Sequence, residues 1–492
     1  MKPYSTIAIA CLLILLTSPC LNAQSITWQR TLDTIPNSIF RRTIESPGNI
    51  YAAIGSGVSI ASGGPTKMMF VKFDQFGNIL AQSFFDTSDT DVYDGYWIEN
   101  AYGAGYIIAG AGEGLNGDAY LVRSDENGRV LWQRTFGGLE LDQARCIKKD
   151  GDNGYILLVT TFSLSAEADI LVIRTDSLGN QIWSTVIGLP NSIDVAREIE
   201  VTPEGGFILI GTRVTMGVDS MYLVKLSNSG NIAWERTYRV MRASEGKSIE
   251  QTGDSGFLLG GICDSSQNNM RSILIRVDSI GNVIWTRTYT TNFNEWCKSI
   301  RVINDGRFAM CGMSDSTDLG FERAIVRICD LKNGNIFLER YFWGSVWTYT
   351  QNSFESVELL SNRGFVLSGF ADFGATRAFV VKTDSLLQVT PVGINHSGDS
   401  LGNPAYLTAT PNPFNGNTVI SFYTHERSNM EIQLFDLSGR QVYQNSFYSD
   451  RIGLNRFRLD LNESQLPSGI YFCRLISGAS PEMRILKLAY LK

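Results

Sequence analysis

A basic residue recurs every 51 positions along much of this chain, and no other feature constrains the fold as strongly. The residues that keep this interval, with a seventh after a longer step of 55, are Lys72, Arg123, Arg174, Lys225, Arg276, Arg327 and Lys382. Each ends a short apolar run, and an Asp usually stands two positions later, with Ser227 and Cys329 in that place elsewhere. Self-similarity at a fixed period of about 20–50 residues is typical of solenoids, propellers and repeat arrays. The period therefore predicts a protein of seven repeats.

Four short segments rich in β-forming residues lie within one repeat, separated by Gly, Asn, Asp and Ser turns. In a representative repeat they are residues 182–186, 196–201, 207–211 and 221–226. Such segments favour strands, and the residues between them favour turns. Four strands in about 50 residues are typical of one blade of a β-propeller. We therefore predict an all-β chain with a seven-bladed β-propeller.

The two ends of the repeat region are each incomplete. A strand that usually carries Trp follows each basic strand after a short turn, at Trp132, Trp183, Trp234 and Trp285, with Leu80 and Leu338 in the same position. A turn this short makes the two strands antiparallel neighbours. The last repeat ends at Asp384 without such a strand, whereas the chain begins with an unassigned one, Trp28–Leu32. We expect residues 28–32 to pair with residues 379–383 and to close a propeller over residues 24–384.

The beginning of the chain and its charge point to export. Lys2, the apolar run from Ile7 to Leu16 and the small residue Ala23 have the order of a cleaved signal peptide over residues 1–23. No later segment reaches the 18 or so apolar residues expected of a membrane-spanning helix. The formal net charge is −7 without a basic cluster, so nothing in the sequence indicates a nucleic-acid partner.

A second all-β pattern follows a Gly- and Pro-containing linker at residues 385–403. Strand-like runs separated by turns occupy residues 404–492, near 419–423, 431–436, 441–447, 455–460, 469–475 and from 483. This spacing predicts a small β-sandwich of the immunoglobulin-like type.

Three short motifs in this tail carry a family resemblance. They are Pro411-Asn412-Pro413-Phe414, the run from Ile432 to Val442 with Asp436 and Gly439, and Leu466 to Tyr471 with Ser468 and Gly469, followed by Lys487 near the end. In this order the tail resembles the type A sorting domain of the type IX (Por) secretion system of Bacteroidota-like bacteria. The resemblance implies that the secretion machinery is a partner. It also implies export through the outer membrane, usually with removal of the tail and with release or attachment at the cell surface.

The repeats offer little that indicates catalysis. The two histidines, His396 and His425, lie outside the predicted propeller, which therefore lacks the commonest general base and metal ligand. The six cysteines after the signal peptide show no zinc-site spacing. Recurring acid–base pairs are interpreted as ion pairs between blades: Asp142/Arg145, Asp194/Arg197, Glu245/Lys247 and Glu295/Lys298.

The long loops share one face of the predicted ring, and loops on a rigid scaffold concentrate binding residues. Their aromatic side chains are the candidate ligand-binding residues, at Tyr93, Trp97, Trp296, Trp343, Trp347 and Tyr349. A set of carboxylates could hold Ca²⁺ without the full spacing of a known calcium loop, at Asp86, Asp89, Asp91 and Asp94. No other cofactor is expected.

These observations favour an exported, non-enzymatic binding or scaffold protein whose long-loop face binds a glycan or a protein. Two alternatives stay open. One is a secreted carbohydrate-active hydrolase or lyase that uses loop carboxylates, and the other is a structural component of the cell surface.

Overall fold

The structure is a computed structural model of the 492-residue chain. It describes residues 27–389 apart from 33, 36, 59–65, 86–91, 114–116, 152–153, 166, 265–268, 290–293, 316–321, 343–350 and 373–375, and residues 407–491 apart from 425–426, 437–439, 452, 463–465 and 478–482. The predicted signal peptide, most of the predicted linker and both histidines lie outside these residues. The exact domain boundaries given above therefore stay predictions.

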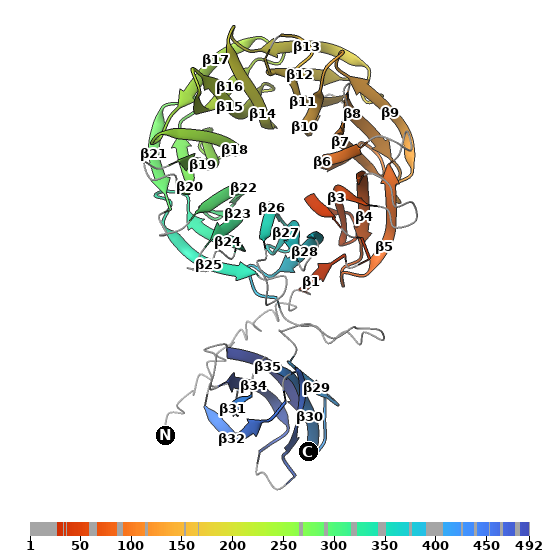
Figure 1. Ribbon diagram of the computed structural model, residues 1–492, viewed down its shortest axis with the longest axis vertical. Helices are drawn as coiled ribbons and strands as arrows, with labels where there is room; N and C mark the ends of the chain where they lie inside the picture. Colours follow the sequence, from red (N-terminus) through yellow and green to blue (C-terminus); the bar gives the residue numbers. More distant parts are fainter. Residues whose placement is uncertain are drawn as a thin grey trace, which may run out of the picture.

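Seven four-stranded antiparallel sheets stand in a ring, and the strand that comes first in the chain lies innermost in every sheet but the seventh, where β26 is innermost (Figure 1). Blades 1 to 3 are β2 (Ile39–Ser46), β3 (Ile50–Val58), β4 (Thr66–Phe73), β5 (Ile79–Phe85); β6 (Val92–Asn100), β7 (Tyr106–Glu113), β8 (Ala119–Ser124), β9 (Val130–Phe136); and β10 (Asp142–Asp150), β11 (Gly154–Thr161), β12 (Asp169–Thr175), β13 (Gln181–Ile187). Blades 4 and 5 are β14 (Ser192–Val201), β15 (Phe207–Thr215), β16 (Val218–Leu226), β17 (Ile232–Tyr238); and β18 (Ala243–Gln251), β19 (Phe257–Asp264), β20 (Met270–Val277), β21 (Val283–Thr288). Blades 6 and 7 are β22 (Glu295–Ile303), β23 (Arg307–Asp315), β24 (Glu322–Asp330), β25 (Ile336–Phe342); and β26 (Asn352–Leu359), β27 (Phe365–Asp372), β28 (Thr376–Thr383), β1 (Trp28–Thr31). The predicted seven-bladed β-propeller is confirmed.

The apolar pattern of each strand follows its position in the blade. Every residue of β11 is buried, because a middle strand has a neighbouring blade on both faces. In the outer strand β13 exposed and half-buried residues alternate instead. The buried side chains form a core between each blade and the next, and the one between blades 4 and 5 contains Ile210, Leu223 and Ile273. The ring therefore depends on contacts between blades.

The N-terminal strand closes the ring. β1 pairs antiparallel with β28, with Trp28 opposite Lys382 and Thr31 opposite Phe379. The indole of Trp28 is 3% exposed, and its Nε1 donates to the carbonyl of Gln75 in blade 1 at 3.0 Å. This strand belongs to the seventh sheet and contacts the first, which is the pairing that the two incomplete ends predict.

The recurring basic residue holds the first turn of its own blade. Arg174 lies 2.5 Å from the carboxylate of Asp150, and Lys225 lies 2.6 Å from that of Glu204. Blade 6 departs from this pattern, because its basic residue stands one position before the equivalent place in the sheet. There Ile328 pairs with Leu338 as Arg276 pairs with Trp285, so Arg327 faces the opposite side of the sheet.

A similar slip of one position affects the outer strand of blade 1. Lys72 pairs with Ala81, so Ala81 and not Leu80 occupies the position of the recurring Trp. Because successive side chains of a strand point to opposite faces, a one-residue error changes the predicted surroundings completely.

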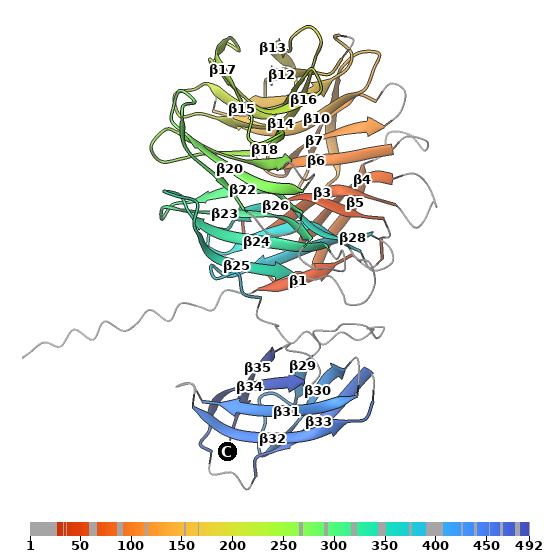
Figure 2. The same ribbon diagram turned by 60° about the vertical axis from the view of Figure 1, so that its left-hand side comes forward.

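The C-terminal residues form two further sheets, as the predicted sandwich requires. One sheet has the order β29 (Leu407–Thr410), β30 (Asn417–Thr424), β33 (Gly453–Asp460), and the other β32 (Gln441–Ser449), β31 (Ser428–Phe435), β34 (Gly469–Ser477), β35 (Met483–Tyr490). Figure 2 shows strands β31, β32 and β34 of the larger sheet running side by side. Side chains from both sheets share one core, among them Phe422, Ile432 and Leu475.

Two further points bear on the predictions. In the described part of the chain, no helix is long and apolar enough to cross a membrane. The six cysteines after the signal peptide are all buried and free, and a free Cys in such a place packs as a small apolar residue.

Candidate functional site

Every innermost strand contains a β-bulge at the same place in its blade. In β10, for example, the pairing with β11 shifts between Ala144 and Cys146, which leaves Arg145 as the extra residue. The equivalent residues of the seven blades are Arg41, Tyr96, Arg145, Arg197, Lys247, Lys298 and Glu355. A bulge bends the strand and redirects its side chain. We call these seven residues the bulge ring.

Contacts between blades fix several of these bulges. The backbone N–H of Ile249 donates to the carboxylate of Glu198 in the preceding blade at 3.0 Å. Ile300 N–H donates in the same way to Ser248 Oγ at 3.2 Å. Each acceptor directly follows the bulge residue of its own strand. A backbone donor near one bulge is thus satisfied by the neighbouring blade, which ties the local geometry to ring assembly.

A cavity of about 340 Å³ lies within the ring of innermost strands, and all seven residues of the bulge ring line it. In most blades the residue after the bulge also lines the cavity, and the side chain at this position differs in size from blade to blade. Arg42, Trp97 and Glu198 are large, whereas the corresponding residues in blades 5 to 7 are Ser248, Ser299 and Ser356. The three serines leave open space that longer side chains would fill.

Cations outnumber carboxylates around this cavity. The bulge ring holds five of them and one carboxylate, Glu355, while Asp94 and Glu245 stand close by. The pairs are Arg41–Asp94 at 3.0 Å, Arg41–Glu355 at 3.6 Å, Lys298–Glu355 at 3.7 Å, Lys247–Glu245 at 2.6 Å and Arg197–Glu245 at 3.9 Å. Burial alone would raise the pKa of Glu355, but Lys298 and Arg41 outweigh it and hold this pKa below its usual value. Glu355 is therefore ionised at neutral pH.

The least compensated charges belong to neighbouring blades. The guanidinium of Arg145 lies over the ring of Tyr96 at 4.3 Å and donates to Gln143, and among the described residues no ion pair joins it to a carboxylate. Burial and the charge of Arg145 lower the pKa of Arg197. Burial and the charge of Arg197 likewise lower the pKa of Lys247 to about 8. This side of the cavity is positively charged and short of partners.

A belt of ion pairs lies deeper in the ring. Three positions after the bulge most blades carry a charged residue, and these residues pair with one another and with Arg42 and Glu198. The contacts are Arg42–Glu99 at 3.7 Å, Arg42–Glu358 at 3.0 Å, Lys148–Glu99 at 3.7 Å, Lys148–Glu200 at 2.7 Å, Arg301–Glu198 at 3.4 Å, Arg301–Glu358 at 3.2 Å and Arg301–Glu250. Carboxylates are in the majority here. The two levels of the ring therefore differ in the sign of their excess charge.

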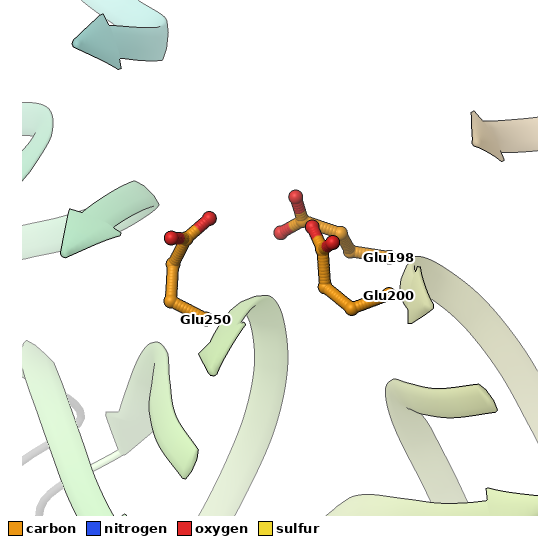
Figure 3. Close-up of side chains that lie close together, drawn as sticks. All are labelled: Glu198, Glu200 and Glu250. Carbon is orange, nitrogen blue, oxygen red and sulfur yellow. The ribbon is translucent and has the colours of Figure 1, made fainter. Parts of the chain in front are cut away.

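Three carboxylates of this belt, from Glu198, Glu200 and Glu250, face one another across β14 and β18, with oxygen atoms within 4.8 Å (Figure 3). Burial raises the pKa of Glu200 and raises that of Glu250 to about 7. Lys148 and Arg301 already donate to this group. Cations and a bound proton thus offset the repulsion that a metal ion would otherwise offset.

Glu250→Gln is expected to stabilise the protein at about pH 8 and to change little at about pH 4. The folded pKa of Glu250 lies above its ordinary value of 4.5, so the folded state binds more protons between those two values. Its contribution to the free energy of unfolding therefore falls as pH rises through that window. One pKa unit corresponds to about 1.4 kcal/mol, and the pKa of Glu250 rises from 4.5 to about 7, so we expect a gain of about 3 kcal/mol at pH 8.

Urea unfolding at both pH values measures this difference. Glu204→Gln is the control, because Lys225 contributes to a lowered pKa for Glu204 and its removal has the opposite sign. If the free energy of unfolding depends on pH in the same way in the parent and in Glu250→Gln, Glu250 does not have a raised pKa.

The structure places the predicted ligand-binding residues at several sites. Trp97 lies in the cavity wall, with Arg42 3.9 Å and Lys148 4.8 Å from its ring. Trp296 is half-buried in β22, and Tyr93 belongs to β6. The remaining three aromatic residues, Trp343, Trp347 and Tyr349, lie outside the described residues, as do the calcium candidates Asp86, Asp89 and Asp91. Asp94, the fourth calcium candidate, pairs with Arg41.

The interpretation of the recurring acid–base pairs as ion pairs between blades is wrong for all four. Asp142 accepts from Ser163 Oγ at 2.7 Å, Asp194 pairs with Arg213 at 2.6 Å, and Glu295 binds Arg327. A separation of three puts two residues on opposite faces of a strand, and the bulge turns the basic one toward the cavity. Glu245 and Lys247, two apart, do pair, although within one strand. The bulge ring was not predicted from the sequence for this reason. The only sign of it in the sequence was the basic member of each of these pairs, which recurs from blade to blade.

The tail motifs meet in the core of the C-terminal domain. The Phe414 ring lies 5.3 Å from that of Tyr490, and Tyr471 contacts Tyr490 from another strand at 6.5 Å. Asn412 Oδ1 accepts from the backbone of Ala489 at 2.8 Å. Of the other motif residues, Pro411 and Pro413 lie between β29 and β30, and Asp436 accepts from Arg440. Ser468 directly precedes β34, Gly469 begins it, and Lys487 belongs to β35. Gly439 lies outside the described residues. The motifs thus hold the last strand in place.

Comparisons with known proteins identify this domain. Residues 409–486 match the family described as the secretion system C-terminal sorting domain. No curated protein matches the chain. The tail is a sorting domain of type IX secretion, and the protein is secreted to the cell surface.

Similar solved structures include PorZ, a bacterial surface component of the type IX secretion system of Porphyromonas gingivalis, at 10% identity and a TM-score of 0.41. The match covers 92% of this chain but 59% of PorZ, which is less than two thirds of it. Another is Sqt1 of Chaetomium thermophilum, with 11% identity and a TM-score of 0.42, where the match covers 71% of this chain and 96% of Sqt1. A third is an α-L-arabinanase of Penicillium chrysogenum, with 13% identity and a TM-score of 0.41, where the match covers 62% of this chain and 99% of the arabinanase. These likenesses add no functional argument.

Proposed function

We propose that this protein is a non-enzymatic binding protein of the cell surface, and that the cavity of its bulge ring receives the ligand or one end of it. The observation that carries the proposal is that seven bulges direct one side chain from each blade into a single cavity. A site assembled from every blade keeps its geometry because the whole ring supports it. A glycan or a protein segment could enter such a cavity from the outside of the cell.

The state of the carboxylates favours binding over hydrolysis. Asp94, Glu245 and Glu355 each lie within ion-pair distance of a cation. Although burial alone would raise the pKa of Glu245, Lys247 and Arg197 hold it below its ordinary value. A glycosidase needs a carboxylic acid that keeps its proton near neutral pH, which requires a raised pKa. The carboxylates beside the cavity have the character of fixed counter-ions, whereas Glu250, whose pKa is raised to about 7, belongs to the belt and does not line the cavity.

Lys298→Trp tests the cavity whatever the ligand is, because an indole placed in the bulge ring fills much of the 340 Å³. Glycan-array binding, with neutral, uronic-acid and sulfated members, is expected to fall at least tenfold, which corresponds to about 1.4 kcal/mol. Lys332→Trp is the matched control, since Lys332 lies on an exposed turn of the same blade. Unchanged binding by Lys298→Trp would place the site elsewhere, and no binding by folded parent protein would contradict glycan recognition.

A further inference from the structure

We propose that the cavity of the bulge ring binds a tetrahedral oxyanion, a sulfate or phosphate group that is free or esterified to a larger ligand. This inference rests on the proposed binding role and narrows it to one ligand chemistry. It depends on three features of the cavity: its charge, its unused donors and the directions from which they come.

The first feature is the uncompensated charge. Four cations of the bulge ring share the carboxylates of Asp94, Glu245 and Glu355, and the fifth, Arg145, has no ion pair among the described residues. Arg145 and Arg197 belong to neighbouring blades, and burial together with the charge of Arg145 lowers the pKa of Arg197. Like charges that are buried together are costly unless a counter-ion joins them. A divalent anion would offset the excess.

The second feature is a set of unused hydrogen-bond donors. The Nε atoms of Arg41, Arg145 and Arg197 are buried, and none of them has a hydrogen-bond partner among the described residues. Buried donors are nearly always satisfied in folded proteins. Three such atoms on residues that line one cavity indicate that an acceptor belongs there. A sulfate carries acceptors only, which suits a site with an excess of donors.

The third feature is direction. Arg41, Arg145, Arg197, Lys247 and Lys298 come from five different blades, so their charged groups approach the cavity from around the ring. A carboxylate presents two oxygens in one plane, whereas a tetrahedral oxyanion presents three or four that diverge. Guanidinium and ammonium groups together bind such oxygens well. A volume of about 340 Å³ also leaves room for the part of a ligand next to the anionic group.

The aromatic residues of the cavity support the same interpretation. Arg145 lies over the ring of Tyr96, and Arg42 lies over that of Trp97. These rings hold guanidinium groups in position by cation–π contact. We therefore expect recognition through charge and not through stacking of a sugar on an aromatic face.

Calorimetry and thermal unfolding of the full chain test the proposal, with sodium sulfate, phosphate and acetate compared at constant ionic strength in chloride. We expect one sulfate or phosphate per chain and a higher melting temperature, since a ligand that binds only the folded state stabilises it. The variant is Arg145→Gln with Arg197→Gln. Its affinity for sulfate should fall about 100-fold, at about tenfold for each charge-assisted contact.

The same double variant should melt at a higher temperature than the parent when no sulfate is present, because it removes the repulsion between the two guanidinium groups. A purely structural role would not combine higher stability with lost binding. Arg236→Gln with Arg340→Gln is the matched control, since it removes two exposed arginines from the outer strands β17 and β25. Esterified ligands are tested with glucose 6-phosphate and glucosamine 6-sulfate against the unsubstituted sugars.

Two outcomes would overturn the inference. One is a sulfate or phosphate effect no larger than that of chloride in the parent, and the other is an effect of equal size in the Arg145→Gln, Arg197→Gln variant. If glycans on the array still bind and Lys298→Trp still abolishes that binding, the oxyanion is refuted and the binding role stands. If both tests fail, neither the ligand chemistry nor the binding role survives.

Discussion

Deletion of residues 24–34 is expected to lower the melting temperature of the propeller by about 10 °C or more. The deletion removes β1 and leaves β28 as an unpaired edge in the seventh blade. It also removes Trp28, whose ring lies 5.6 Å from Phe73 and 5.8 Å from Tyr51 in blade 1. Loss of one buried Trp typically costs about 3–5 kcal/mol. Each kcal/mol shifts the melting temperature by about 2–4 °C in a domain of about 200 residues and by less in this larger propeller, but the unpaired edge of β28 adds to the loss of the Trp.

A rearranged chain provides the control for this deletion. Residues 384–388 already form the turn that leads to the outer strand in other blades, with Asp384 N–H donating to the carbonyl of Gln388 at 3.1 Å as Asp278 N–H donates to Asn282 at 2.9 Å. Residues 28–32 placed directly after Gln388 should therefore reoccupy the empty edge and restore most of the stability. Differential scanning calorimetry compares the three proteins. A deletion variant that melts within about two degrees of the parent would show that ring closure does not depend on this strand.

Deletion of residues 404–492 is expected to abolish appearance of the protein at the cell surface. These residues contain the sorting domain, which addresses the protein to type IX secretion. The effect should be close to all-or-none, because the sorting domain lies in the deleted residues and not in the propeller. Immunoblots of the cell-surface and medium fractions of the native host measure it.

A fusion protein and a point variant test whether the tail alone directs export. Residues 404–492 joined to an unrelated exported carrier should direct that carrier to the surface. Phe414→Ala in the full chain should reduce export, since it removes a ring that packs on Tyr490 in the core of the tail. Normal export after the deletion would rule out the sorting role for this chain. Intact-mass measurement of the exported protein tests the expected start at Gln24 and removal of the tail.

The contrast between these two predictions and the cavity shows which information is local in the chain. Strand runs, turns and the 51-residue period are short-range patterns, so blade number and the partner of Trp28 can be predicted by counting. The tail motifs are likewise contiguous, so the order of residues along the chain is enough to identify the sorting domain. The pairing of distant strands did not have to be predicted separately, because every repeat has the same order of four strands and forms the same kind of sheet.

The position of one residue within a blade is a different matter. Arg327 keeps the interval but faces the other side of its sheet, because Ile328 holds the pairing position in blade 6 that Arg276 holds in blade 5. Asp194 stands three positions before Arg197 but binds Arg213 on the next strand. A period-2 structure makes every such assignment depend on register, and register is set by pairing across strands.

The sequence by itself therefore determined the fold class, the blade count, the closure and the destination of this protein. Only the tertiary structure decided that Arg145 and Arg197 line one cavity, because that depends on a bulge at one position and on the meeting of seven strands. In the alternation of apolar and polar residues along a strand, a bulge shows only as one extra residue. Loops of variable length on either side make that extra residue hard to recognise. The charge of the cavity is a sum over residues spread along more than 300 positions, from Arg41 to Glu355. Ring closure is what places those charges within reach of one ligand.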